Sequence, residues 1–180
     1  MISTSTIVDT IIKIIDILGY LGPYLLGIIT MILLFFYKLY TLLIFYSIGY
    51  GLNTIINLIL KGLIKQPRPT EDKHIFTLEK TTDKRISFDR YGMPSGHAQS
   101  VCYSTIFVWF ALKNVWITLF YLFIVVASVT QRIKYKNHDW KQVIIGMIVG
   151  IIVGYIMFEI SQKKLKGNLK RRADDNGPKI

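Results

Sequence analysis

Cysteine is nearly absent from this sequence, with Cys102 as the single example among 180 residues. One thiol inside an apolar run gives no support to a disulfide framework, a zinc site or thiol catalysis. Acidic residues are also few, 11 against 22 lysines and arginines, and no cluster of them suggests a metal site. We therefore expect no metal and no cofactor. The first residues lack a basic region and carry Asp9 and Asp16, so no cleavable signal peptide is expected.

Charge is missing from long stretches of the chain, although the formal net charge is +11. The sequence is 52% hydrophobic, which is unusual for a soluble domain of this length. Apolar runs alternate with short basic connectors. A basic balance is typical of proteins that bind nucleic acid, an anionic membrane surface or a phosphate substrate. Because the charges lie between apolar runs, nucleic acid is the least favoured of these partners.

The apolar runs predict an all-α fold, a multi-pass transmembrane bundle of about five spanning helices. The runs are Gly19–Tyr37, Tyr40–Leu60, Ala98–Leu112, Val115–Val129 and Val143–Ile160. The first two approach the roughly 20 residues that cross a bilayer, whereas the third and fourth are short and either extend into their flanks or lie in thinned bilayer. Before them, Ile7–Leu18 places its charges on one helical face, which predicts an amphipathic helix in the membrane interface. A degenerate spanning helix is the alternative.

The chain is expected to form one membrane-embedded domain over residues 1–162, followed by a basic, disordered tail over residues 163–180. If each of the five predicted helices crosses once, the segment Lys61–Pro94 and the connector Thr130–Gln142 lie on the same side of the membrane. Three fragments that carry chemistry would then meet at that face. They are Lys61–Pro69, Pro94–His97 and Arg132–His138.

The first fragment places Lys61 and Arg68 seven residues apart, with Pro67 and Pro69 ending the helix between them. A guanidinium beside an ammonium can bind a phosphate, although snorkelling of Lys61 and a solvated Arg68 are the simpler alternatives for the fragment alone.

In the second fragment, Ser95 can cap a helix whose free N–H groups, starting at Gly96, attract an anion, and His97 lies at the helix start. The alternative is an ordinary capped helix with an interfacial histidine.

The third fragment places Arg132 and His138 around a turn between two helices. Gln142 lies four residues after His138 on the same helical face, so its side-chain oxygen can bond one ring nitrogen and leave the other nucleophilic. Asp139 is turned away from His138 and is better explained as an acid at a helix N-terminus. An ordinary interfacial Arg132 and His138 remains the alternative.

Together the three fragments resemble the type 2 phosphatidic acid phosphatase superfamily, over roughly Leu60–Gly146. Its pattern is Lys-x6-Arg-Pro, then Pro-Ser-Gly-His, then Ser-Arg-x5-His-x3-Asp. The matching residues are Lys61, Arg68, Pro69, Pro94, Ser95, Gly96, His97, Arg132 and His138. Two positions depart from the pattern, since Gln131 replaces the serine and Gln142 replaces the final aspartate. In having glutamine at the second position, the chain resembles dolichyldiphosphatases and glucose-6-phosphatases. The local segments IKQPRP, YGMPSGHAQ and HDWKQV are most similar to those of dolichyldiphosphatases.

The resemblance implies a metal-independent lipid phosphatase that hydrolyses a dolichyl-type polyisoprenoid diphosphate through a phosphohistidine. His138 would be the nucleophile and His97 the acid, with Gln142 orienting His138. Lys61, Arg68, Ser95, Gly96 and Arg132 would hold the phosphate. The partners would be the membrane and a phosphorylated lipid, and no oligomeric state is predicted. A phosphatidic acid or other lipid phosphate phosphatase, and an inactive lipid-binding membrane protein, are the alternatives.

The location implied by this resemblance is the endoplasmic reticulum. The dense basic cluster of the tail places the tail in the cytosol and the site on the lumenal side. Tyr46, Tyr91 and Trp140 could line the entrance to the site, although core packing or an interfacial aromatic belt is the preferred interpretation. His74, in the long loop, is expected to be a surface histidine.

Overall fold

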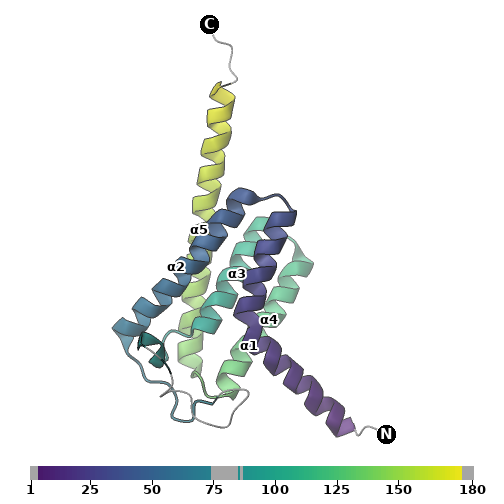
Figure 1. Cartoon of the computed structure of the whole chain (residues 1–180), viewed down its shortest axis with the longest axis vertical. Helices are drawn as coiled ribbons and strands as arrows, with labels where there is room; N and C mark the ends of the chain where they lie inside the picture. The colour runs from purple at the N-terminus through teal and green to yellow at the C-terminus, as the bar shows by residue number, and fades with distance from the viewer. Residues whose placement is uncertain (1–3, 74–84, 86, 176–180) are drawn as a thin grey trace.

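Helices make up the regular structure of this protein, in a computed structural model that describes residues 4–73, 85 and 87–175. The elements are α1 (Thr4–Phe36), α2 (Tyr40–Ile64), the short 3₁₀ helix η2 (Ser87–Arg90), α3 (Gly96–Leu112), α4 (Val115–Lys134) and α5 (Trp140–Asp175). Figure 1 shows the five α-helices as a bundle with α3 at its centre. The predicted all-α, multi-pass membrane bundle is confirmed. His74 and residues 176–180 lie outside the described residues.

Within the described residues, four helices are long and apolar enough to cross a membrane: they lie within Thr6–Phe36, Tyr40–Ile64, Val115–Lys134 and Trp140–Gly167. The remaining predicted span is α3. Its 17 residues give a helix about 25 Å long, which is a little less than the thickness of the hydrocarbon core of a bilayer. It contacts all four other α-helices. The α2–α3 and α4–α5 connections lie at one end of the bundle, as the crossing order predicts (Figure 1).

The N-terminal amphipathic segment is not a separate helix, because α1 runs unbroken through the predicted segment Ile7–Leu18 and through Gly19–Tyr37 as far as Phe36. No helix-ending residue separates them, and Pro23 is the one proline inside α1. The helix bends away from the bundle toward the N-terminus (Figure 1). Isoleucines on this projecting part, such as Ile11 and Ile14, are about half exposed. The placement of this part in the membrane interface stays a prediction.

Pro23 tethers α1 to its neighbours. A proline has no N–H, so the carbonyl of Gly19, four residues earlier, lacks its helical donor. Ser128 of α4 donates a hydrogen bond to that carbonyl through its Oγ. The Tyr50 hydroxyl of α2 donates to the Pro23 carbonyl at 2.9 Å. Polar groups freed in a membrane helix are commonly satisfied by neighbouring helices in this way.

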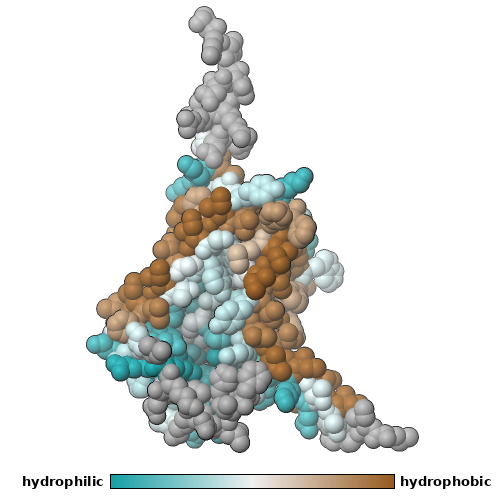
Figure 2. Space-filling view, in the orientation of Figure 1, coloured by the Kyte–Doolittle hydropathy of each residue, from teal (hydrophilic) through white to brown (hydrophobic). Residues whose placement is uncertain are grey.

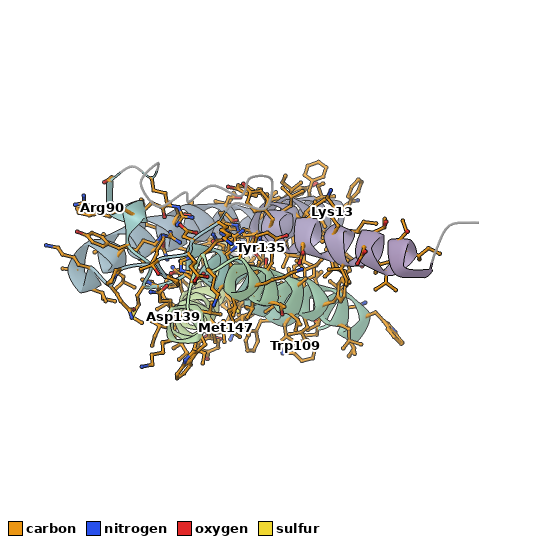
Figure 3. All side chains as sticks on the ribbon, turned by 90° about the horizontal axis from the view of Figure 1, so that it is seen from below. Lys13, Arg90, Trp109, Tyr135, Asp139 and Met147 are labelled. Carbon is orange, nitrogen blue, oxygen red and sulfur yellow. The ribbon has the colours of Figure 1, made fainter. Side chains whose placement is uncertain are left out.

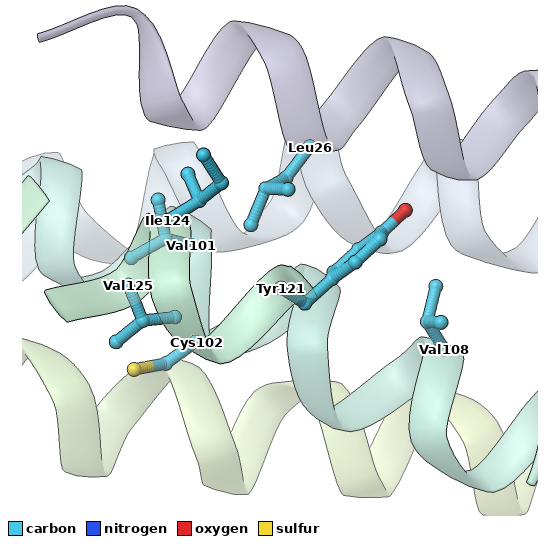
Figure 4. Close-up of a cluster of buried hydrophobic side chains, with 7 residues drawn as sticks. All are labelled: Leu26, Val101, Cys102, Val108, Tyr121, Ile124 and Val125. Atoms are coloured by element: carbon cyan, nitrogen blue, oxygen red, sulfur yellow. The ribbon is translucent and has the colours of Figure 1, made fainter. Parts of the chain in front are cut away.

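Two apolar clusters hold the bundle together. The first joins α1, α3 and α4 and is drawn in Figure 4: Leu26, Val101, Cys102, Val108, Tyr121, Ile124 and Val125. The second joins α1, α2, α3 and α5: Leu34, Leu42, Tyr46, Tyr103, Phe107, Met157 and Phe158. Cys102 is therefore a buried packing residue, and Tyr46 belongs to the core, as the preferred interpretation of that aromatic residue predicts.

Glycines on α5 bring it close to the backbone of α3. Gly146, Gly150 and Gly154 recur every four residues and therefore form one ridge. A Cβ added at Gly146 would lie 2.5 Å from the Ser95 carbonyl oxygen. A Cβ added at Gly150 would overlap the Gln99 carbonyl oxygen. Small residues allow this approach between membrane helices. The ridge holds the turn before α3 against the helix that follows His138.

The basic tail differs from the prediction over part of its length. Helix α5 continues to Asp175, so the backbone of residues 163–175 is helical where disorder is expected from the sequence. Lysine, arginine, glutamine and leucine are good helix formers, and a helix already nucleated inside the bundle extends through them at little cost. The division between a membrane domain and a tail stays a prediction.

Candidate active site

A polar pocket opens at the end of the bundle where α2 ends, α3 begins and the α4–α5 connection turns. It is a cavity of about 500 Å³. Six of the residues predicted to form the site line it: Lys61, Arg68, Gly96, His97, Arg132 and His138. Figure 3 looks toward this end from below, with Arg90, Tyr135 and Asp139 around it. Lys61 and His138, which are 77 positions apart in the chain, thus share one pocket. The catalytic roles of the lining residues stay predictions.

Ser95 and Gln142 lie outside the lining of this pocket, and both side chains are fully buried. Ser95 occupies the N-cap position of α3 as predicted, but its side chain makes no capping hydrogen bond. Its Oγ has no hydrogen-bond partner among the described residues, and its backbone N–H donates to the Gln142 carbonyl at 2.9 Å. Ser95 therefore connects the start of α3 to α5, with Gly96 and His97 facing the pocket.

Two contacts determine which nitrogen of the His138 ring carries the hydrogen. The Gln142 Nε2 donates to the Pro67 carbonyl at 2.9 Å, which turns its Oε1 toward the His138 Nδ1 at 3.1 Å. An amide oxygen only accepts, so Nδ1 carries the hydrogen. On the other side of the ring, Arg68 Nη1 lies 3.0 Å from Nε2. Arginine only donates, so Nε2 presents its lone pair.

The charges around His138 keep this ring neutral. Burial, followed by Arg68 and Lys61, holds the pKa of His138 well below its usual range. Burial and neighbouring Arg85 lower the pKa of Arg68 to about 10, so its guanidinium remains charged at neutral pH. The Arg68 Nε is buried and has no hydrogen-bond partner in the described part of the chain. The site thus combines the neutral imidazole of His138 with the Arg68 guanidinium, whose Nε–H is available to bind a further acceptor.

Tyr20 of α1 supports two predicted site residues from the opposite wall. The Arg132 guanidinium lies over the Tyr20 ring, 5.3 Å from its centre, and Arg132 Nε donates to the Gln131 Oε1 at 2.6 Å. His97 Nε2 lies 3.1 Å from the Tyr20 carbonyl oxygen. Because a carbonyl only accepts, this nitrogen carries a proton. Gln131, which replaces the serine of the family pattern, therefore orients Arg132.

A carboxylate that the sequence interpretation missed also lines the pocket. Asp89 of η2 accepts a hydrogen bond from Lys61 and lies 3.5 Å from Arg68 Nη2. Arg85 is a further lining residue, with Nη2 3.0 Å from a carboxylate oxygen of buried Asp72. Both fall in the long polar loop, where no spacing rule relates them to the motifs.

The turn before His138 is held by the same loop. Asn137 Nδ2 donates to the Asp72 carboxylate and, at 2.7 Å, to the Lys73 carbonyl. Arg68 Nη1 donates to the Asn137 carbonyl at 2.9 Å. Asp139 accepts from the Gln142 N–H at 2.8 Å, which is the helix N-terminal role predicted for it. These contacts fix the position of His138 from both sides.

A buried polar seam between α2 and α3 positions the second fragment. Asn53, Asn57 and Lys61 recur every four residues on one buried face of α2. Asn57 Nδ2 donates to the Pro94 carbonyl at 3.2 Å and to the Gln99 Oε1 at 2.8 Å. Gln99 Nε2 in turn donates to the Asn53 Oδ1 at 2.9 Å. The four-residue spacing of polar side chains in an apolar helix was the signal available for this seam.

Comparison with known proteins identifies the family. The PAP2 superfamily matches residues 40–166, and the chain belongs to that superfamily. Dolichyldiphosphatase 1 of Homo sapiens is 27% identical over 174 residues, which cover 83% of this chain and 68% of the relative. The Dictyostelium discoideum protein of the same name is 32% identical over 146 residues, covering 75% and 58%.

A third relative has a different name. "Lipid phosphate phosphatase epsilon 1, chloroplastic" of Arabidopsis thaliana is 31% identical over 111 residues, covering 57% of this chain and 35% of the relative. The matched regions thus span between about a third and two thirds of these relatives' lengths. No solved structure matches the chain significantly.

Proposed function

We propose that this protein is a membrane lipid phosphatase that hydrolyses a polyisoprenoid diphosphate of the dolichyl type to its monophosphate. The observation that carries the proposal is the His138 Nε2 lone pair, presented among the cations Lys61, Arg68 and Arg132 in one pocket. The dolichyldiphosphatase relatives support the choice of substrate.

In the first step the His138 Nε2 attacks the terminal phosphorus and the bond to the bridging oxygen breaks. His97 enters this step as an imidazolium, gives a proton to the bridging oxygen as the lipid monophosphate leaves, and becomes neutral. Lys61, Arg68 and Arg132, with the N–H groups at the start of α3, stabilise the equatorial oxygens as charge redistributes. Arg68 moves from His138 to the phosphate for this step, and its Nε, which has no partner among the described residues, is available as well.

In the second step water attacks the phosphohistidine and gives its proton to His97, while the P–N bond breaks. Inorganic phosphate leaves, and His138 returns to its neutral form with the hydrogen on Nδ1. Gln142 accepts from Nδ1 throughout.

Because cations of the chain neutralise the phosphate, we expect turnover in EDTA. Complete loss of turnover on chelation, with recovery in Mg²⁺, would contradict the proposed metal independence.

The shape of the pocket supports a lipid substrate. From the cationic end it continues between α1 and α2, where Tyr24, Tyr50 and Leu58 line it. Tyr24 is 63% exposed on the outside of the bundle. Figure 2 shows a pale, polar strip between the apolar flanks formed by α2 and α1. A headgroup can therefore reach the cations while its hydrocarbon chain stays in the bilayer.

Phosphate release by the purified full chain in detergent tests the function, with dolichyl diphosphate, phosphatidic acid and glucose 6-phosphate compared. We expect dolichyl diphosphate to be hydrolysed fastest. His138→Ala should abolish release, whereas Lys113→Ala, a basic residue at the far end of α3, should not change it. Equal, slow release by wild type and His138→Ala would leave the inactive lipid-binding protein as the better account.

Phosphatidic acid is the second candidate substrate, because the Arabidopsis relative carries the name of a lipid phosphate phosphatase. Faster release from phosphatidic acid than from dolichyl diphosphate would favour it. Acid-labile labelling of the wild type by the radioactive terminal phosphate, absent in His138→Ala, would support the phosphohistidine for either substrate.

The proposed location is the endoplasmic reticulum, with the pocket facing the lumen. The basic residues within 163–172 belong to the part of α5 that projects from the end of the bundle opposite the pocket (Figure 1). By the positive-inside rule that end faces the cytosol. A tag after Ile180 should be cleaved by protease added to sealed microsomes, and its protection would contradict the orientation.

A further inference from the structure

A carboxylate of the chain sits where the proposed mechanism places a phosphoryl group. Lys61 donates to the Asp89 Oδ1, and the Arg68 Nη2 lies 3.5 Å from the same oxygen. The lysine and arginine side chains are 2% and 4% exposed, whereas the Asp89 side chain is 49% exposed. The exposed Asp89 carboxylate, at the mouth of the pocket, thus covers the buried Lys61 and Arg68.

The contact comes from a short element anchored on α2. The Phe88 ring packs over Gly62, where an added Cβ would lie 3.2 Å from it. The Asp89 carbonyl accepts from Arg68 Nη2 at 2.9 Å, and the Gly92 N–H donates to the Gln66 carbonyl at 2.8 Å. These bonds hold the backbone of η2 in place and leave the carboxylate as the exposed part that can turn aside.

Arg68 links this carboxylate to the nucleophile. Its Nη1 donates toward the His138 Nε2, and its Nη2 faces Asp89. Protein groups therefore occupy both the lone pair that attacks phosphorus and the cations that hold phosphate. Carboxylate and phosphoryl oxygens use the same N–H donors of lysine and arginine, so they compete for one place.

We propose that Asp89 is a specificity-determining residue that takes the place of a phosphoryl group between Lys61 and Arg68 and yields it only to a more highly charged anion. The inference rests on the proposed function, because that place is the phosphate site of the mechanism. The ligand class is a phosphoryl group with at least two negative charges, such as the terminal group of a diphosphate. A singly charged anion binds Lys61 and Arg68 no more strongly than the Asp89 carboxylate does, so it does not displace that carboxylate.

The charges of the described lining residues support this role after displacement as well. Four are cationic, Lys61, Arg68, Arg85 and Arg132, and Asp89 is the one carboxylate among them. A displaced Asp89 carboxylate stays attached to η2, close to the bound anion, and repels it at short range. This repulsion weakens the binding of inorganic phosphate and favours its release as product.

The experiment measures binding of inorganic phosphate to the purified full chain in detergent, by calorimetry and by inhibition of turnover. Asp89→Asn removes the charge and keeps the shape, and we expect it to bind phosphate at least about tenfold more tightly. Asp89→Ala should act in the same direction, which guards against an effect of the amide itself. Glu71→Gln, an exposed acid of the same loop, should leave affinity within about twofold of wild type.

Equal or weaker phosphate binding by both Asp89 variants, with wild-type melting temperatures, overturns the inference. If wild type turns over lipid diphosphate and these variants bind phosphate no more tightly, the Asp89 inference alone fails. If no lipid is hydrolysed but both variants bind phosphate more tightly, the proposed function fails and the role of Asp89 at an anion site is supported.

Discussion

The Nδ1 of His138 lies 3.1 Å from the Oε1 of Gln142, four residues further along the chain. The same amide donates through its Nε2 to the Pro67 carbonyl. This second bond decides which end of the amide faces the ring, and hence which ring nitrogen keeps its lone pair. Glutamine thus supplies the acceptor for which the family pattern uses an aspartate, and it also joins α5 to the loop after α2.

Gln142→Leu should lower kcat about 10- to 100-fold and change KM less, because it removes the acceptor that orients His138 but no phosphate ligand. Gln142→Glu keeps an acceptor for Nδ1 and should retain more activity than the leucine variant. It places a carboxylate against the Pro67 carbonyl, so its melting temperature should fall. Steady-state phosphate release and thermal unfolding check both, and wild-type kcat in Gln142→Leu would refute the orienting role.

Stability should depend on pH through His138. Burial, Arg68 and Lys61 hold its pKa well below the value of about 6.5 that it has in an unfolded chain. Between these two pKa values the unfolded state binds more protons, so the free energy of unfolding rises with pH and this contribution is complete above about 6.5. Lowering the pH to 5.5 should cost about 1 kcal/mol from this residue.

His138→Gln isolates the effect, because every other titratable residue is present in both proteins. Melting temperatures in detergent at pH 7.5 and 5.5 give a difference for each protein, and the wild type should show the larger fall on acidification. An identical fall in the two proteins would mean that His138 is solvated and titrates normally.

Helix positions and the meeting of the motifs could be predicted from the sequence, because each depends on local pattern and on crossing order. Uncharged runs place α2 and α4 closely. An even number of crossings between the fragments, none between Lys61 and His97 and two between His97 and His138, brings all three residues to one end. The merging of the amphipathic segment with α1 could not be predicted from the charges of Asp9, Lys13 and Asp16, since a charged face fits an interfacial helix equally well.

Residues that act through tertiary contacts were out of reach of motif spacing. Asp89 faces Lys61 because η2 packs on α2, and Tyr20 lies under Arg132 because α1 passes the α4 end. Neither pairing has a fixed separation in the sequence. The glycine ridge of α5 was visible as a four-residue repeat, but its partner, the α3 backbone, follows only from the packing.

Replacing Gly150 with alanine should destabilise the bundle by about 1–3 kcal/mol, because the new methyl group overlaps the Gln99 carbonyl and pushes α5 from α3. The matched control is Gly51→Ala, where an added Cβ meets nothing within 4 Å. It should be neutral or slightly stabilising, since alanine is the better helix former. Thermal unfolding in detergent compares the two, and equal melting temperatures would contradict the close α3–α5 contact.

Asn57→Leu should reduce kcat more than stability alone explains, because Asn57 holds the Pro94 carbonyl and Gln99 from inside the bundle. Its loss leaves two buried acceptors short of a donor, at a cost of about 1–3 kcal/mol, and loosens the turn that carries Gly96 and His97. Asn114→Ala is the control, because Asn114 caps α4 at the far end of the bundle. It should cost about 1 kcal/mol with kcat unchanged. If both variants lose stability and both keep wild-type kcat at a temperature where they are folded, the seam stabilises the bundle without positioning the catalytic turn.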